Sequence, residues 1–271
     1  MIRCDYHMHS SFSGDSESPM EEMLEAGIRK GLQAICITEH NDPDFIYIKE
    51  DEKGMFDLDT ESYLNKAALV KELYKDKIQL FSGVEIGVQE HIGNKLESYV
   101  SSHPFDFVIA SSHLCDGMDP YYPEFFEGRS DKEAFRAYFA SIDRNIRAFR
   151  NFDVYGHLDY VVRYAPDKNK NYRAHDYTDI LECILRFLIE NGKGIEINSG
   201  GFRSGLGTPN PCIEILKLYR SLGGEIITTG SDAHIPADVA YSFPILEEIL
   251  KECGFNYYTI FSQRKPEFIK L

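Results

Sequence analysis

The chain has 271 residues, and its 43% hydrophobic and 27% charged content is ordinary for a globular protein that buries one large core. The formal net charge of −15 argues against binding to long nucleic acids or to an anionic membrane, because Lys and Arg are too few to offset phosphate repulsion. No apolar run reaches the roughly 18 residues of a membrane span, and the first residues show no signal-peptide pattern, so we expect neither.

The six cysteines are widely dispersed, and no two of them form a Cys-x-x-Cys pair. This spacing argues against a thiolate zinc site or a redox motif. Cys4, Cys36 and Cys183 lie in apolar patterns and are expected to be small buried hydrophobic residues. Such cysteine usage is typical of a reducing cytosol, so we predict a cytoplasmic protein.

Strand-like and helix-like patterns alternate along the chain, beginning with the apolar run Ile2–Tyr6. Ser18-Pro19-Met20-Glu21 then predicts a helix start, with a serine N-cap, a proline at the first helical position and a capping-box glutamate. Helical spacing continues to Ile28, and Gly31 is typical of a helix end. Further strands are expected at Gln33–Thr38, Ile78–Glu85, Phe105–Ser111, Asp153–His157, Gly194–Asn198 and Glu225–Thr229, with one more candidate at Tyr257–Phe261.

The segments between these strands either show helical spacing or form long loops. Asn41–Thr60 and Cys115–Ser130 are long for βα loops and are rich in acidic and aromatic residues. The aromatic stripe Phe135–Phe149, in a helix that Asp131 is expected to cap, indicates core rather than a substrate platform. Helical spacing also occurs at Tyr63–Tyr74, Leu181–Leu188, Ile215–Leu222 and Phe243–Leu250.

About seven βα units in a row imply parallel strands joined by crossovers, so we predict one α/β domain over residues 1–271. A closed barrel is favoured over an open doubly wound sheet, because reactive residues follow almost every strand instead of clustering at one switch point. In a barrel, the carboxyl ends of all the strands meet at one face, where the active site is expected.

Histidine and acidic residues follow the predicted strands. His7 and His9 are two apart in an extended segment, so both imidazoles project to one side and can reach one metal ion. Taken alone, each such residue has a structural alternative, for example a strand-end cap for His157 or a buried ion pair for Glu85. Their joint placement at equivalent strand ends favours a metal site built from His7, His9, Asp15, His40, Glu85, His113, His157, Asp232 and His234.

Imidazole and carboxylate ligands suit Zn²⁺, Mn²⁺ or Fe²⁺, and this set is large enough for two or three divalent ions. A carboxylate such as Glu85 can bridge two of them. The remaining histidines lie in polar segments away from strand ends and are not expected to be ligands; they are His91, His103 and His175.

The motifs around these residues resemble those of the polymerase and histidinol phosphatase (PHP) superfamily. They are His-x-His at 7–9, Phe-Ser-Gly-Asp at 12–15, Thr-Glu-His at 38–40, Gly-Val-Glu at 83–85, Ser-Ser-His at 111–113, Gly-His at 156–157 and Gly-Ser-Asp-Ala-His at 230–234. The segments 107–113, 156–164 and 194–198 are similar to the histidinol-phosphate phosphatase branch. The family usually reads Ser-Asp-Gly where this chain has Ser13-Gly14-Asp15.

The resemblance implies a distorted (β/α)7 barrel that binds up to three metal ions at the carboxyl ends of its strands. It assigns His7, His9, Glu85 and Asp232 to the first ion, Glu85, His113 and His157 to the second, and Asp15, His40 and His234 to the third. It further implies that a metal-bound hydroxide hydrolyses L-histidinol phosphate to L-histidinol and phosphate, a step of histidine biosynthesis.

Two arginines lie beside the predicted ligands. Arg163 follows the fifth strand, and Arg203 follows the Gly-rich segment after the sixth. We expect both guanidinium groups to bind the substrate phosphate, the alternative being solvated surface arginines. Asp232 or a nearby imidazole would carry a proton to the leaving alkoxide. Acidic or aromatic residues of the two long loops would contact the rest of this small substrate, such as Asp42, Asp116 or Asp119.

Two other functions stay open at this point. The chain could be a PHP-superfamily phosphatase or phosphodiesterase that acts on nucleotides or other small phosphoesters. It could also be a non-catalytic, metal-stabilised module that binds a partner, although the full set of candidate ligands argues against this. The sequence specifies neither the native metal nor the oligomeric state.

Overall fold

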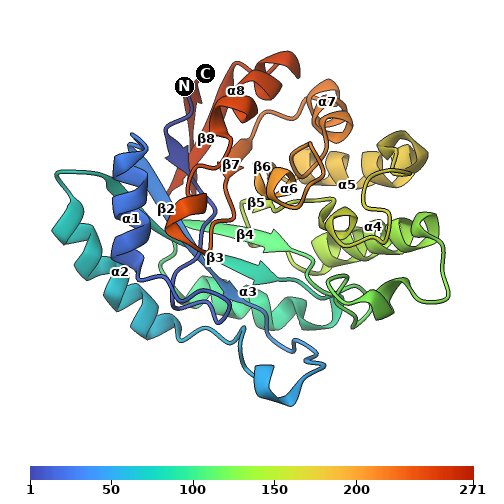
Figure 1. Cartoon of the computed structure of the whole chain (residues 1–271), viewed down its shortest axis with the longest axis horizontal. Helices are drawn as coiled ribbons and strands as arrows, with labels where there is room; N and C mark the ends of the chain where they lie inside the picture. The colour runs from blue at the N-terminus through green and yellow to red at the C-terminus, as the bar shows by residue number, and fades with distance from the viewer.

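Seven parallel strands form the centre of the computed structural model, which describes all 271 residues. Each strand pairs with the next one along the chain, and helices cover the outside of the sheet (Figure 1). The strands are β1 (Cys4–Asp5), β2 (Ala34–Asn41), β3 (Gln79–Gly87), β4 (Phe107–Ser111), β5 (Val154–Tyr155), β6 (Gly194–Asn198) and β7 (Ile227–Gly230).

The first and last of these strands meet and close the barrel. The Tyr6 N–H donates to the Thr229 carbonyl at 2.8 Å, and the Asp232 N–H donates to the His7 carbonyl at 2.8 Å. The barrel is irregular, because β1 and β5 have only two residues each. The fold is therefore the distorted (β/α)7 barrel that the sequence predicted.

Helices of amphipathic sequence pack their apolar sides onto the barrel. In α1, for example, Met20, Met23 and Leu24 are buried. The helices are α1 (Met20–Arg29), α2 (Thr60–Tyr74), α3 (Gly93–Ser102), α4 (Asp131–Ala148), α5 (Thr178–Glu190), α6 (Gly200–Arg203), α7 (Ile213–Ser221) and α8 (Phe243–Glu252). Short 3₁₀ helices lie at Glu50–Glu52, Glu90–Ile92, Pro123–Phe126, Tyr160–Arg163, Ala174–Tyr177 and Pro236–Asp238.

Helix α3 was not predicted from the sequence. It begins with a glycine and buries only Leu96 and Val100 besides that Gly93, so its apolar residues are too few to give a helical stripe. The aromatic stripe of α4 does lie in the core, as predicted. None of the helices combines the length and the hydropathy that crossing a membrane requires.

Three local predictions were wrong. Ser18 does not cap α1, because its hydroxyl donates to the backbone carbonyl of His234 at 3.0 Å instead. Helix α4 is capped by Ser130, with Glu133 completing a capping box, and Asp131 is its first residue. Cys183 lies on the outer side of α5 and is exposed, since the buried stripe of that helix begins at Leu181 and continues at Ile184.

The C-terminal strands stand outside the parallel sheet. The candidate strand near residue 257 is β8 (Tyr257–Ser262), and it forms an antiparallel hairpin with β9 (Lys265–Lys270), which was not predicted. Phe261 of β8 stacks on Phe107 with ring centroids 5.1 Å apart and accepts a hydrogen bond from the Tyr6 hydroxyl at 3.0 Å. The hairpin thus covers the end of the barrel opposite the carboxyl ends of the strands.

Candidate metal centre

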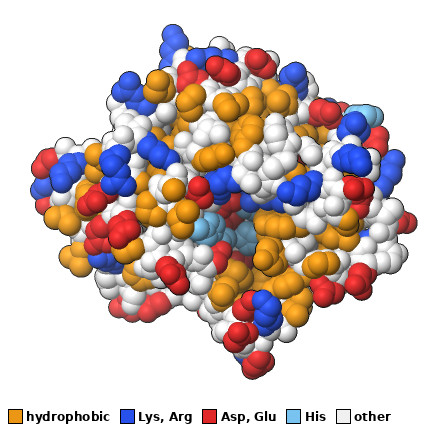
Figure 2. Space-filling view, in the orientation of Figure 1, with side chains coloured by type: hydrophobic (Ala, Val, Ile, Leu, Met, Phe, Trp, Pro, Cys, Tyr) orange, Lys and Arg blue, Asp and Glu red, His pale blue; other side chains and the backbone are white.

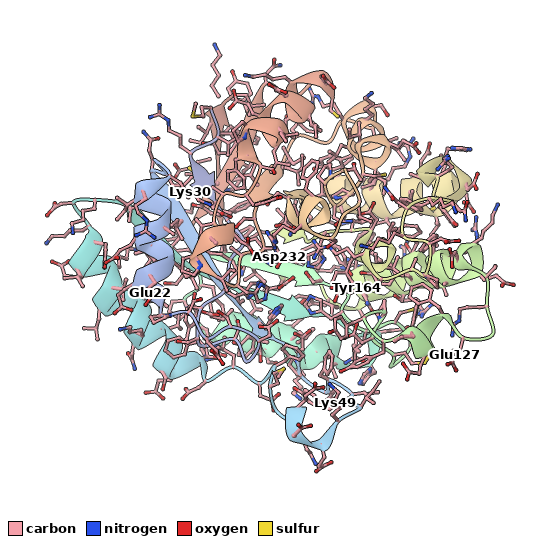
Figure 3. The ribbon with its side chains drawn as sticks, in the orientation of Figure 1. Glu22, Lys30, Lys49, Glu127, Tyr164 and Asp232 are labelled. Atoms are coloured by element: carbon pink, nitrogen blue, oxygen red, sulfur yellow. The ribbon has the colours of Figure 1, made fainter.

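A cavity lies at the carboxyl ends of the barrel strands. Figure 2 shows it as a hollow with histidine side chains at its base, apolar side chains to its right and below it, and Lys or Arg side chains above it. Asp232 and Tyr164, which both line it, lie near the centre of this face, whereas Lys49 and Glu127 lie at its edge (Figure 3). The lining also includes Asp15, His40, Asp42, Phe45, Phe56, His113, Asp119, His157, Tyr160, Arg163 and His234.

Glu85, on strand β3, lies at the centre of the polar residues and is completely buried. Its Oε2 is 3.0 Å from His40 Nδ1 and 3.1 Å from His7 Nε2. Its Oε1 is 2.9 Å from His157 Nε2 and 3.2 Å from His113 Nε2. One carboxylate from the middle of the barrel thus contacts imidazoles from four other strand ends.

Asp232 approaches the same place from the segment after β7. Its Oδ1 is 3.5 Å from His9 Nε2 and 3.6 Å from His7 Nε2. His9 Nε2 is in turn 3.6 Å from Glu85 Oε2. The four residues predicted to bind the first ion therefore lie together, and so do Glu85, His113 and His157, the set predicted for the second.

The third predicted group sits closer to the cavity opening. Asp15 Oδ2 is 3.1 Å from His234 Nε2 and 3.5 Å from His40 Nε2. The order Ser13-Gly14-Asp15 still brings the carboxylate to these imidazoles, and a side chain at Gly14 would meet the Met55 carbonyl at 2.3 Å. The structure thus brings all nine predicted residues together, while their roles as metal ligands stay a prediction.

Several buried atoms in this cluster form no hydrogen bond, although other polar atoms lie close to them. They include His7 Nε2, His9 Nε2, His40 Nδ1 and Glu85 Oε2. Buried polar atoms without partners are costly, and imidazole nitrogens that converge on a carboxylate are the donor set that divalent transition metals take. The residues present therefore fit divalent metal ions.

Charges within the cluster oppose the effect of burial on the pKa values of Glu85 and His40, but they add to it for His9. Burial would raise the pKa of Glu85, but the positive charges of neighbouring histidines, the largest from His7, hold that pKa well below its usual range. Burial and the charge of His40 lower the pKa of His9, which keeps a neutral imidazole ready to coordinate. Burial would lower the pKa of His40 too, but Asp15 and Glu85 raise it well above its usual value.

The guanidinium groups of the two arginines, which we expected to bind the substrate phosphate, are both engaged by other groups of the protein. Arg163 lines the cavity but is buried, and its Nη1 donates to Asp232 Oδ2 at 2.8 Å. Arg203 does not line the cavity. It donates from Nη1 to the Ser231 carbonyl at 2.5 Å and from Nη2 to the Asp232 carbonyl at 2.6 Å. A role in substrate binding stays a prediction for both arginines. In the structure, Arg163 contacts the Asp232 carboxylate and Arg203 contacts the backbone at Asp232.

Two further groups that support the histidines were not predicted from the sequence. Asp42, proposed only as a substrate contact, has its Oδ1 2.7 Å from His113 Nδ1, on the ring side opposite Glu85. Ser13 Oγ lies 3.2 Å from His9 Nδ1 and donates to the buried carboxylate of Glu39 at 2.6 Å. Glu39 is part of the Thr-Glu-His motif, but no pattern in the sequence indicates that this buried acid supports the position of a neighbouring histidine.

A comparison with protein families identifies the family of this chain, since the PHP domain matches residues 5–200. The chain belongs to the PHP domain family. Within that family, a histidinol-phosphatase of Lactococcus lactis subsp. lactis is 34% identical over 267 residues, which cover 98% of this chain and 96% of the relative. A probable histidinol-phosphatase of Clostridium acetobutylicum is 31% identical, covering 93% of this chain and 94% of that one.

Two solved structures have the same fold as this chain. The crystal structure of histidinol phosphate phosphatase from Lactococcus lactis, complexed with Zn, L-histidinol and phosphate, matches with a TM-score of 0.87 and 32% identity, covering 98% of each chain. A putative histidinol phosphatase from Listeria monocytogenes matches with a TM-score of 0.77 at 18% identity, covering 89% of this chain and 99% of that one, and shows the same fold. The sequence-based resemblance to the histidinol-phosphatase branch of the PHP family is confirmed.

Proposed function

We propose that this chain is a metal-dependent phosphomonoester hydrolase that converts L-histidinol phosphate to L-histidinol and phosphate in histidine biosynthesis. The observation that carries the proposal is the convergence of imidazoles from several strand ends on the buried carboxylate of Glu85, in a chain of the histidinol-phosphatase branch. A relative whose structure holds Zn, L-histidinol and phosphate supports both the substrate and the metal.

The proposed ligands are those grouped above. His7, His9, Glu85 and Asp232 would hold one ion, Glu85, His113 and His157 a second, and Asp15, His40 and His234 a third. Zinc, iron or manganese fits this donor set. Bound divalent ions lower the pKa of water and stabilise the charge that develops on phosphoryl oxygens.

In the proposed reaction, the oxygen of water adds to phosphorus, the ester P–O bond breaks, and a proton lost by that water passes to the leaving alkoxide. Arg163 holds Asp232 Oδ2, so that Oδ1 of the same carboxylate faces His7 and His9. Asp232 is the proposed proton carrier. The positive charges of His7 and Arg163 overcome the effect of burial and keep the pKa of Asp232 well below its usual range, so its carboxylate is ionised before the reaction begins.

The leaving group would lie toward the aromatic side of the cavity, lined by Phe45, Phe56, Tyr160 and Tyr164. Of the three acids considered for its cationic groups, Asp119 is the best placed. Asp42 already contacts His113, and Asp116 lies outside the cavity in an ion pair with Arg144 at 2.5 Å. Asp119 lines the cavity and accepts a hydrogen bond from the backbone N–H of Tyr121 at 2.8 Å.

The proposed function also has consequences for the domain organisation, the cellular location and the binding partner of the chain. We propose that residues 1–271 act as one catalytic domain, because a single cluster of 73 buried hydrophobic residues runs through the barrel and its helices. A cytoplasmic location agrees with a biosynthetic role and with six cysteines that are all unpaired. The partner would be a small phosphorylated substrate.

The proposal is tested by phosphate release from L-histidinol phosphate, using protein reconstituted with Zn²⁺, Fe²⁺ or Mn²⁺ and protein stripped with a chelator. We expect turnover only after reconstitution. His9→Ala and Asp232→Asn should lose turnover while circular dichroism shows an intact fold. Full activity in chelated protein, or wild-type activity in either variant, would contradict the proposed centre.

A further inference from the structure

Strand β6 differs from the other strands of the barrel, because no predicted metal ligand lies on it or directly after it. Its inward face carries Glu196 and Asn198, two apart and therefore on the same side of the strand. Both side chains are completely buried. Neither residue has a role in the proposed reaction, although a buried carboxylate is costly unless specific partners satisfy it.

The partners of Glu196 are parts of the candidate centre. Its Oε1 lies 2.7 Å from His7 Nδ1. Its Oε2 accepts from the backbone N–H of His157 at 3.0 Å and from Asn198 Nδ2 at 3.1 Å. An ionised carboxylate only accepts hydrogen bonds, so His7 Nδ1 carries a proton, and Nε2, on the side of Glu85 and Asp232, is the ring nitrogen that would bind a metal ion.

Asn198 continues the contacts toward a second predicted ligand. Its Oδ1 accepts from Arg163 Nη2 at 2.9 Å and from the Gly200 N–H at 2.8 Å. The same guanidinium donates from Nη1 to Asp232 Oδ2 at 2.8 Å. A continuous chain of hydrogen bonds therefore runs from His7 to Asp232, through residues that are not among the predicted metal ligands.

Glycines on the neighbouring segments leave room for this chain. A Cβ at Gly230 would lie 2.0 Å from Glu196 Oε1, and a Cβ at Gly200 would lie 2.8 Å from both Asn198 Oδ1 and Arg163 Nη2. Any side chain at these two positions would displace the network. The backbone on both sides of β6 is thus fitted to the Glu196 carboxylate and the Asn198 amide.

We propose that Glu196 and Asn198 are positioning residues that hold His7 and Asp232 in the orientation in which both coordinate the same ion. Glu196 fixes the ring and tautomer of His7, and Asn198 links that carboxylate to the arginine that orients Asp232. Outer partners of this kind typically change metal affinity by about 10- to 100-fold when removed. The inference rests on the proposed metal centre and adds the residues that shape it.

Glu196→Gln is the most informative variant, because it keeps the shape and removes the charge. If the amide oxygen faces His7, its NH₂ meets the two N–H donors that now share Oε2. If the NH₂ faces His7 instead, His7 Nδ1 becomes the acceptor and its proton moves to Nε2, which blocks coordination. Either orientation disturbs the first ion. Asp153→Asn is the matched control, since it removes a buried carboxylate that pairs with Arg264 at 2.6 Å and contacts no predicted ligand.

The experiment measures metal content per chain, metal affinity by competition with a chelator, and the visible absorption of Co²⁺-loaded protein. We expect Glu196→Gln to bind one ion about 10- to 100-fold more weakly, with an altered Co²⁺ spectrum, while Asp153→Asn matches the wild type in both. Unchanged affinity and an unchanged spectrum in Glu196→Gln would overturn the inference.

Two further measurements separate this inference from other failures. Wild-type protein that binds no stoichiometric metal and releases no phosphate would sink the proposed function itself, whereas an active, metal-loaded wild type isolates the question of Glu196. If Glu196→Gln does not fold, Asn198→Asp provides the second variant. It replaces the NH₂ that donates to Glu196 with an oxygen, and it should also weaken one ion by at least about 10-fold. Wild-type metal affinity in that variant would overturn the inference.

Discussion

The guanidinium of Arg163 donates from Nη1 to Oδ2 of Asp232 at 2.8 Å, and both side chains are buried. The same group also donates from Nε to Asn210 Oδ1 at 2.8 Å and from Nη2 to Asn198 Oδ1 at 2.9 Å. Arg163 thus has three acceptors within the protein, and its first effect is to fix one oxygen of Asp232 and aim the other at His7 and His9.

Arg163→Lys is expected to fail despite keeping the charge. One ammonium cannot replace a planar fork that reaches three separate acceptors, and losing a charged hydrogen bond costs about 1.5–3 kcal/mol. We therefore expect kcat to fall roughly 10- to 100-fold together with a loss of bound metal. Steady-state kinetics and metal analysis check this. A variant with full metal content that raises KM alone would point back to a simple phosphate clamp.

Arg203→Ala separates two roles for that residue. Its N–H groups hold the Ser231 and Asp232 carbonyls, where Asp232 has a φ of +57°, so we expect the variant to lose metal and kcat. The inhibition constant for inorganic phosphate should change little in whatever fraction remains metal-loaded. If instead metal content is normal and phosphate inhibition weakens tenfold or more, Arg203 contacts the substrate phosphate directly.

The titration of Asp119 should make the substrate preference depend on pH. Burial raises its pKa to about 6, so the carboxylate is neutral below that pH and negative above it. A cationic leaving group should therefore be favoured increasingly as the pH rises from 5 to 7. The measurement is the ratio of kcat/KM for L-histidinol phosphate to that for p-nitrophenyl phosphate, in which titrations of the metal centre cancel. Asp119→Asn should flatten this ratio, and an unchanged pH profile would remove Asp119 from the leaving-group site.

Removal of the metal ions should lower the free energy of unfolding. Metal binding should also weaken as the pH falls. Ions that bind only the folded chain at 100 times their dissociation constant stabilise it by about 2.7 kcal/mol, which raises Tm by roughly 5–10 °C in a protein of this size. Asp15 and Glu85 raise the pKa of His40 in the metal-free protein against the effect of burial, so binding must displace protons and weaken as the pH falls. Calorimetry with and without a chelator, between pH 6 and 8, checks both effects. Equal Tm values throughout would exclude tight binding.

The barrel and the candidate ligands could be predicted from the sequence for a physical reason. Parallel strands of a barrel end at one face, so the strand pattern alone places a residue such as His40 or Glu85, at the end of an apolar run, on that face. The grouping of His7, His9 and Asp232 also depended on family motifs, because closure between β1 and β7 joins residues more than 220 positions apart.

The supporting residues could not be predicted in this way. Asp42 contacts His113 from a loop, and Glu196 contacts His7 from a strand whose alternation only shows that it faces inward. Whether an inward acid faces an imidazole, an arginine or an ion depends on side chains from distant strands. Arg163 shows the same limit, since its position after the fifth strand was evident but its burial against Asp232 was not.

The central claim is tested most directly by kcat/KM values at defined metal loading for L-histidinol phosphate, nucleoside monophosphates, glycerol phosphate and p-nitrophenyl phosphate. The account predicts that L-histidinol phosphate is preferred by at least about 100-fold, because both its phosphate and its cationic leaving group are contacted. Equal kcat/KM values for histidinol phosphate and the nucleotides would contradict it and would instead favour a general phosphatase of the PHP family.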